Sequence, residues 1–92
     1  MNIQRVMKAI SDSTRRDILC LLKTKSLSAG EIASNFDIST AAISRHLSVL
    51  QDAQLVETKR KGKNIIYSLN ISLVEEMLLF INSIFSKNNT NI

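Results

Sequence analysis

The sequence of 92 residues contains no proline and only two glycines, Gly30 and Gly62. Because no linker-like stretch and no internal repeat divides it, we expect a single domain over residues 1–92. No run approaches the roughly 18 apolar residues of a membrane span, and the first residues lack the apolar segment of a secretion signal. These absences predict a cytoplasmic protein that does not insert into a membrane.

Cysteine and histidine occur once each. Cys20 has no disulfide partner, and its apolar neighbours in the stretch DILCLL predict a buried thiol. His46 has no second Cys or His at ligand spacing, so we expect no metal site and no cofactor. We expect a structural role for His46, with a hydrogen bond to backbone or phosphate. The chain also lacks a Ser–His–Asp set, paired carboxylates and a glycine-rich phosphate loop, so we expect no enzyme activity.

Acidic residues are fewer than basic ones. Eight Asp and Glu against 12 Lys and Arg give a net charge of +4, and the sequence pI is near 9.6. This balance favours a polyanionic partner. An apolar fraction of 45% is typical of a globular protein.

The spacing of apolar residues predicts a mainly α fold with a small β-hairpin. A first helix is expected within residues 1–11. A second begins at Asp12, a good N-cap, and runs to about Leu22. A last helix is expected over residues 72–87, followed by a frayed tail at 88–92.

The middle of the chain has the pattern of a helix-turn-helix over residues 28–53. Ser28 and Glu31 have the spacing of a capping box at the start of a third helix. Ser39 is placed to cap a fourth helix that ends near Ala53. Two helices joined by a turn of about three residues are typical of this motif.

Two β-rich runs follow and predict a wing over residues 56–69, with Gly62 at positive φ in its turn. The turn region is strongly basic, and no acid lies between Glu57 and Glu75. Phosphate contact explains this clustering. Lysines on an edge strand also prevent association between sheets, and both explanations can hold. The residues predicted to contact DNA here are Lys59, Lys61, Gly62 and Lys63, with Arg60 among the cations of the turn.

The predicted fourth helix, STAAISRHLSVL from Ser39 to Leu50, has an unusual outer face. Its apolar stripe is opposed by small and hydroxyl-bearing residues with a single arginine, where Glu and Lys would be usual. Such a slim face can enter the major groove, where an arginine can contact guanine O6 and N7. A solvated helix without a special role is the alternative. The predicted DNA-binding residues are Ser39, Thr40, Ala41, Ser44, Arg45 and Ser48.

The last helix is apolar over a wide arc, more than packing within one small domain should need. A two-fold homodimer built from both terminal helices would bury the surplus. The alternative is that this helix packs only across its own domain. The residues predicted for the interface are Ile3, Val6, Met7, Leu73, Met77, Phe80, Ile81 and Ile84.

Three stretches together resemble the ArsR/SmtB-type winged-helix repressors: MKAISDSTRRDILCLL, LSAGEIASNFDISTAAISRHLSVLQDAQLV and KRKGKNIIYSL. The small size, the KAISDSTRR opening and the wing are most similar to the SdpR-like autorepressor branch. The resemblance implies a winged helix-turn-helix and a homodimer that binds an imperfect inverted repeat in a promoter and blocks transcription. It also implies base reading by Thr40, Ala41, Ser44 and Arg45.

The chain departs from this family pattern at two positions. Ser13 replaces the usual Pro at the start of the second helix, which weakens that start slightly. Gln54 replaces the usual Gly after the recognition helix, at a cost of roughly 1 kcal/mol if the backbone is left-handed there. The metal ligands of the ion-sensing members are missing from residues 28–36 and 73–87, so we expect no metal sensing.

The sequence therefore predicts a sequence-specific repressor that binds double-stranded promoter DNA, including its own promoter, as a homodimer. An unidentified protein regulator, oxidation of Cys20 or the protein's own concentration would release it from DNA. The alternative is a protein-interaction module that uses the same fold and the apolar last helix to hold a protein partner.

Overall fold

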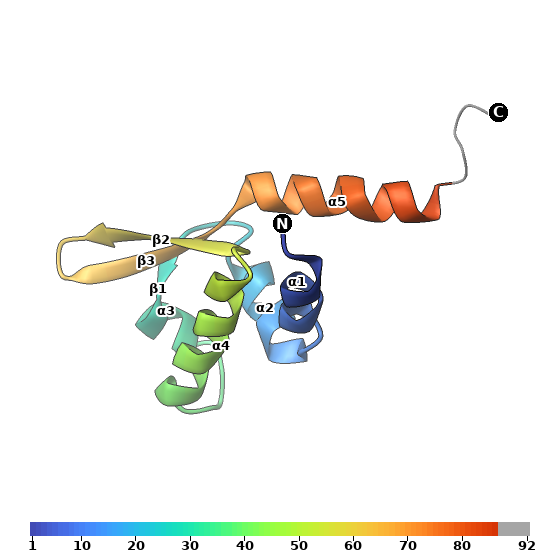
Figure 1. The fold of residues 1–92 in the computed structure, drawn as a ribbon. Coiled ribbons are helices and arrows are strands. Elements are labelled where there is room, and N and C mark those ends of the chain that lie inside the picture. Colours follow the sequence, from blue (N-terminus) through green and yellow to red (C-terminus); the bar gives the residue numbers. More distant parts are fainter. Residues whose placement is uncertain (87–92) are drawn as a thin grey trace.

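The computed structural model describes residues 1–86 and shows a mainly helical chain with a small antiparallel sheet, as predicted (Figure 1). Lys87 and the predicted tail at 88–92 lie outside the described residues. The elements in chain order are α1 (Ile3–Ile10), α2 (Ser13–Leu21), β1 (Leu27–Ser28), α3 (Ala29–Ala33), α4 (Thr40–Asp52), β2 (Val56–Lys61), β3 (Asn64–Leu69) and α5 (Ile71–Phe85).

Each helix begins at a polar side chain that accepts a backbone N–H from its first turn. The predicted caps are confirmed: Asp12 accepts from Arg15 at the start of α2, and Ser39 accepts from Ala42 at the start of α4. The capping box between Ser28 and Glu31 is present in both directions. Because a side-chain cap satisfies donors that have no partner within the helix, these residues fix where the helices start.

The sheet has three strands, and the sequence predicted only two. The hairpin of β2 and β3 was expected, but β1 also pairs with β3, through Leu27↔Tyr67 and Ser28↔Ile66, in the order β1-β3-β2. A strand of two residues is too short for a visible alternation of apolar and polar positions. It nevertheless anchors the base of the wing, because Leu27 is buried in the core.

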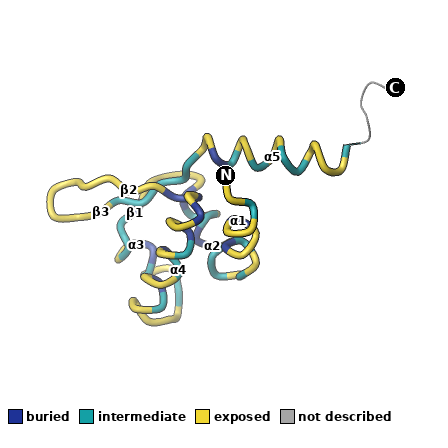
Figure 2. Tube along the Cα trace, viewed as in Figure 1, coloured by how far each residue is buried: buried dark blue, intermediate teal, exposed yellow. Residues whose placement is uncertain are grey.

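The core lies where α1, α2, α3 and α4 meet beneath the sheet (Figure 2). Helical and strand periodicity bring one apolar residue after another to this point. The buried apolar residues are Val6, Ala9, Ile18, Leu22, Leu27, Ile32, Ile43, Leu47, Leu50, Ala53, Leu55, Val56 and Leu73.

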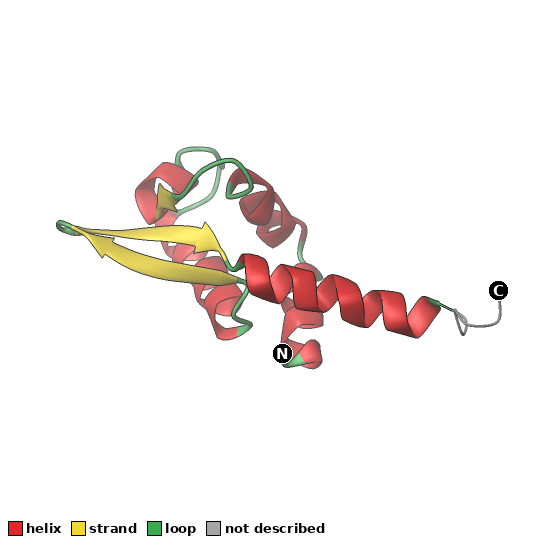
Figure 3. Ribbon diagram, turned by 90° about the horizontal axis from the view of Figure 1, so that it is seen from above, coloured by secondary structure: helices red, strands yellow, loops and turns green. Residues whose placement is uncertain are grey.

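Helix α5 leaves the sheet in the direction opposite to the wing tip and extends beyond the rest of the molecule (Figures 1 and 3). Asn70 fixes its start, since its side chain accepts from the Leu73 N–H at 3.2 Å and donates to the Gln54 carbonyl at 3.0 Å. Leu73 is the only α5 residue buried in the core. Met77, one turn further on, still packs against the core, whereas Leu78, Leu79, Ile84 and Phe85 are exposed.

Two residues assigned to a dimer interface lie instead inside the chain's own core. Val6 is 0% exposed and Leu73 is 4% exposed. Both point toward the body from the parts of α1 and α5 that cover it, so they offer no surface to a second chain. The sequence pattern could not separate these inner positions from the outer positions of the same apolar stripes.

The prediction of a buried Cys20 thiol is wrong, because Cys20 is exposed. Ile18 and Leu22 are four residues apart and both point inward. At about 100° per residue, Cys20 lies about 200° from Ile18, on the outer side of α2. Because most neighbours of Cys20 are apolar, the sequence alone did not show which side of the helix it lies on.

Candidate DNA-binding surface

The predicted base-reading residues form one exposed face of α4. Its apolar stripe of Ile43, Leu47 and Leu50 is buried against the core, which turns the opposite face to solvent. The exposed residues at the cap and on this outer face are Ser39, Thr40, Ala41, Ser44, Arg45 and Ser48.

Arg45 is the single cation on this face, and its guanidinium makes no hydrogen bond or ion pair with the rest of residues 1–86. At the start of α4, the Ser39 side chain accepts the Ala42 N–H at 3.1 Å, and its own hydroxyl hydrogen stays available to donate. The backbone N–H groups of Thr40 and Ala41 precede the first helical hydrogen bonds. The face thus combines a free forked donor with small hydroxyls and the N-terminus of a helix.

The end of α4 connects this face to the wing through a tight backbone reversal. The Leu55 N–H donates to the Leu50 carbonyl at 3.0 Å, and the Gln54 N–H donates to the Gln51 carbonyl at 2.9 Å. These two bonds define a Schellman motif, which requires a left-handed residue after the helix. Gln54 takes that conformation with φ of 63°, so the condition attached to its departure from the family pattern is met. The reversal sets the angle between α4 and β2.

The wing is a hairpin whose two-residue turn consists of Gly62 and Lys63. Gly62 has φ of 64°, which confirms the predicted positive φ. A glycine at the first turn position suits a two-residue hairpin. The predicted wing residues Lys59, Lys61, Gly62 and Lys63 are all exposed, and no ion pair among the described residues involves the lysines.

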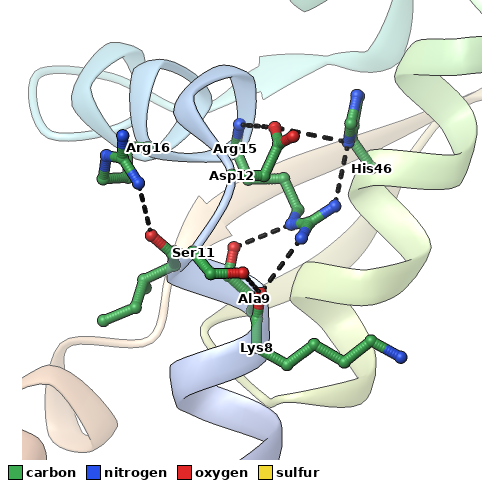
Figure 4. Close-up of polar contacts among 8 residues, drawn as sticks. Lys8, Ala9, Ser11, Asp12, Arg15, Arg16 and His46 are labelled. Carbon is green, nitrogen blue, oxygen red and sulfur yellow. Dashed lines mark hydrogen bonds and ion pairs between the residues drawn. The ribbon is translucent and has the colours of Figure 1, made fainter.

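A polar network holds the inner edge of α4 against the α1–α2 junction (Figure 4). Arg15 donates from Nε to the Ala9 carbonyl at 2.7 Å and from Nη2 to the Lys8 carbonyl at 3.0 Å. Its Nη1 lies 3.2 Å from His46 Nδ1 on α4. Because a guanidinium can only donate, Nδ1 is the acceptor, and neutral His46 carries its hydrogen on Nε2.

This network corrects the prediction for His46, whose partner is the Arg15 side chain and not the backbone. Arg15 and Arg16 were not predicted to have a role, yet both bond to the end of α1, since Arg16 Nη1 also donates to the Ile10 carbonyl at 2.8 Å. Two arginines directly after a break between helices were the available signal, since the last carbonyls of the preceding helix need donors. The structural role of His46 therefore depends on a residue 31 positions away.

Two carboxyl groups near these elements have lowered pKa values. The hydrogen bond from the Arg15 backbone N–H, followed by the charge of the nearby Arg15 guanidinium, lowers the pKa of Asp12. Hydrogen bonds from the Ser28 backbone and side chain lower the pKa of Glu31. Both groups are therefore ionised at neutral pH, Asp12 as the N-cap of α2 and Glu31 as the partner of Ser28 in the capping box of α3.

Among the described residues, no group of three or more His, Cys, Asp or Glu side chains gathers in a way that could bind a metal ion. In the same part of the chain, no helix has both the length and the apolar character needed to cross a membrane.

The model of the family described as "Bacterial regulatory protein, arsR family" matches residues 12–58, from the cap of α2 to the middle of β2. The chain belongs to the arsR family. Proteins of this arsR family are transcriptional regulators, not enzymes. Its helix-turn-helix lies within the matched range, and β3 completes the wing beyond it.

Curated arsR-family relatives and a solved structure agree with this assignment. The chain is 48% identical to the transcriptional repressor SdpR of Bacillus subtilis over 87% of its own length and 93% of that protein. It is 31% identical to the transcriptional activator HlyU of Vibrio cholerae, over 91% of its own length and 78% of the relative's. The structure of an ArsR-like transcriptional regulator from Rhodococcus sp. RHA1 superposes with a TM-score of 0.83 at 32% identity, covering 89% of this chain and 75% of that one. The fold is a winged helix-turn-helix.

Proposed function

We propose that the chain is a homodimeric, sequence-specific repressor that binds an imperfect inverted repeat in a promoter, including the promoter of its own gene. The observation that supports this most directly is the exposed face of α4, which offers an unpaired Arg45 among small residues. A face built this way suits the major groove better than it suits water.

Some residues of this surface contact bases and others contact phosphates. Arg45 donates to guanine O6 and N7, while Ala41, Ser44 and Ser48 line the rest of the groove-facing surface. Ser39 and Thr40 meet a phosphate together with the backbone N–H groups at the start of α4. The exposed wing residues Lys59, Lys61, Gly62 and Lys63 add attraction to the DNA backbone.

The dimer is formed by the terminal helices, and its centre is the part of α5 that extends beyond the body. The stripe that begins with buried Leu73 continues through Met77, Phe80 and Ile81, and it ends in Ile84, which is 57% exposed. Ile3 and Met7 extend this surface on α1. The stripe is flanked by further exposed apolar residues of α5, namely Leu78, Leu79 and Phe85. An apolar surface of this extent on one helix supports burial against a second copy.

Repression is proposed, rather than activation, because the relative at 48% identity is named a repressor, although the 31% relative is named an activator. Autoregulation rests on the resemblance to the SdpR-like branch. We propose that DNA binding needs no metal and does not respond to one. The protein acts in the cytoplasm, and a protein regulator remains one route to its release from DNA.

The test is fluorescence anisotropy on the duplex upstream of its own gene and on a scrambled duplex of the same composition, at low and physiological salt. The proposal expects binding that prefers the promoter, weakens steeply with salt and saturates at two chains per duplex. Equal, weak binding to both duplexes that disappears at physiological salt would contradict it and favour the protein-interaction module.

A further inference from the structure

One ring nitrogen of His46 lies close to two groups of opposite hydrogen-bonding character (Figure 4). Nδ1 is 3.2 Å from Arg15 Nη1, which can only donate, and 3.9 Å from Asp12 Oδ2, a carboxylate oxygen that can only accept. A neutral imidazole with its hydrogen on Nε2 accepts from Arg15. An imidazolium has a hydrogen on both ring nitrogens, so it cannot accept from Arg15 and can donate to Asp12 instead. The charge of His46 therefore decides which of the two partners it binds.

The arrangement in the structure suits the neutral imidazole. The contact with Arg15 has a hydrogen-bond distance, whereas the longer contact with Asp12 is an ion-pair distance only. Protonation of His46 places two positive charges next to each other. The other two nitrogens of Arg15 are bound to the Ala9 and Lys8 carbonyls at the end of α1, which hold the guanidinium in place. The adjustment therefore falls on His46 and on α4, which carries it.

Arg15 and Asp12 are the only charged groups that form a hydrogen bond or an ion pair with His46 within residues 1–86. On α1, the Lys8 side chain extends away from the ring (Figure 4). Helix α3 has one charged residue, Glu31, whose carboxylate belongs to the capping box. The charged residues of β2 are all exposed on the wing. The choice of partner is therefore set by the two groups on α2.

His46 also connects the DNA-facing surface to the rest of the fold. Its bond with Arg15 is the one side-chain hydrogen bond between α4 and another helix in the described part of the chain. Arg45, proposed to read bases, directly precedes His46 on α4. Histidine is the side chain that ordinarily changes charge between about pH 5 and pH 8, and His46 is the only histidine in the chain. A change of pH in this range therefore acts on α4 through His46.

We propose that His46 makes sequence-specific DNA binding sensitive to protons: the neutral imidazole holds α4 in its DNA-reading orientation through Arg15, and protonation breaks this bond and weakens binding to the promoter. This inference rests on the proposed function, because it needs α4 to read DNA. Acidification adds positive charge to a protein and ordinarily strengthens its binding to a polyanion. The expected effect therefore has the opposite sign to that of general electrostatics.

The test compares wild type, His46→Asn and His46→Gln by fluorescence anisotropy on the promoter duplex and the scrambled duplex, at about pH 7.5 and pH 5.5 and constant ionic strength. The amide oxygen of asparagine can occupy the position of Nδ1 and accept from Arg15, but the amide does not titrate. Glutamine does not titrate either, and its longer side chain places the amide beyond that position. Circular dichroism shows whether each protein is folded at both pH values.

The wild type is expected to bind the promoter about tenfold more weakly at the lower pH, while its weak binding to the scrambled duplex does not fall. His46→Asn should match the wild type at the higher pH and keep that affinity at the lower one. His46→Gln should bind the promoter weakly at both. Wild-type affinity that is unchanged or stronger at the lower pH would overturn the inference, as would a fall that persists in His46→Asn or that accompanies unfolding.

A second measurement needs no variant. Nitrogen NMR of the single histidine in the free wild-type protein should show the Nε2–H tautomer at about pH 7.5, and an Nδ1–H tautomer would also overturn the inference. The proposed function fails separately. Promoter preference without any dependence on pH contradicts only the role of His46, whereas no promoter preference at either pH contradicts the proposed function and this inference with it.

Discussion

At the scale of single residues, Gln54 is the position where the backbone and the side chain conflict. Its φ of 63° lies in the left-handed region, and Gln54 is the only residue other than glycine with positive φ within residues 1–86. The conformation is imposed by the two hydrogen bonds that close α4 and turn the chain into β2. A residue with a Cβ is strained there.

Gln54→Gly is predicted to raise the free energy of unfolding by about 1 kcal/mol, because glycine adopts this φ without a steric cost. Urea denaturation followed by circular dichroism measures it. The control is Gln51→Gly, inside the same helix, which should lower stability by about 1 kcal/mol. Destabilisation by both changes would show that the left-handed position is not strained.

The conformation of a residue could be predicted from the sequence where local chemistry determines it, but contacts between distant residues could not. Gly62 was predictable because a hairpin turn fixes its own backbone requirement, whereas only the family resemblance pointed to a left-handed backbone at Gln54. The contact between Arg15 and His46 was not predictable, because it joins residues 31 positions apart through the packing of α4 on the α1–α2 junction. The error for Cys20 has the same origin, since only the packed helix shows which side faces the core.

At the scale of elements, α2 depends on a charged cap. Asp12 accepts the Arg15 N–H at 3.0 Å, and its pKa lies below the ordinary value of 3.8. A carboxyl group with a lowered folded-state pKa stabilises the fold when ionised. That contribution is complete above the unfolded-state pKa and is lost as the pH falls through the folded-state pKa.

Asp12→Asn is predicted to reduce the loss of stability on acidification, because an amide oxygen still caps the helix but does not titrate. The melting temperature of the variant should fall less than that of the wild type between about pH 6 and pH 3. Asp17→Asn, on the exposed side of the same helix, removes an equal charge without a cap and serves as control. An identical pH profile for Asp12→Asn and the wild type would contradict this assignment.

Caps also explain which elements could be predicted. The starts of α2, α3 and α4 follow from Asp12, Ser28 and Ser39, whose side chains act within four residues. Strand β1 depends on pairing with β3, which lies nearly forty positions later in the chain, so its two residues have no local signature. The local sequence pattern thus predicts β2 and β3, and the third strand of the sheet depends on long-range pairing.

At the scale of the whole molecule, α5 is the element whose apolar surface is only partly covered by its own chain. Leu73 is 4% exposed where the helix crosses the body, while Ile84 on the same stripe is 57% exposed beyond it. The sequence predicted the apolar arc but could not locate the edge of the body. For that reason it assigned Val6 and Leu73 to an interface, although both are buried in the chain's own core.

Ile84→Glu is predicted to weaken the homodimer by about 2 kcal/mol, or roughly 30-fold in Kd, because it introduces a charge into an apolar interface. Sedimentation equilibrium over a dilution series measures the change. Asn82→Glu adds the same charge two residues earlier at an exposed polar position and should leave the dimer intact. A wild-type protein that stays monomeric throughout the series would contradict the dimer.

The central claim is that the exposed face of α4 reads DNA bases, and Arg45 tests it most directly. We would measure the anisotropy of Arg45→Ala and Lys61→Ala on the promoter duplex and on single-base variants of it. Arg45→Ala is predicted to cost about 1–3 kcal/mol on the promoter and to relax base preference at one position of each half-site. Lys61→Ala should weaken all duplexes alike. Unchanged promoter affinity and unchanged base preference in Arg45→Ala would show that this face does not read the bases.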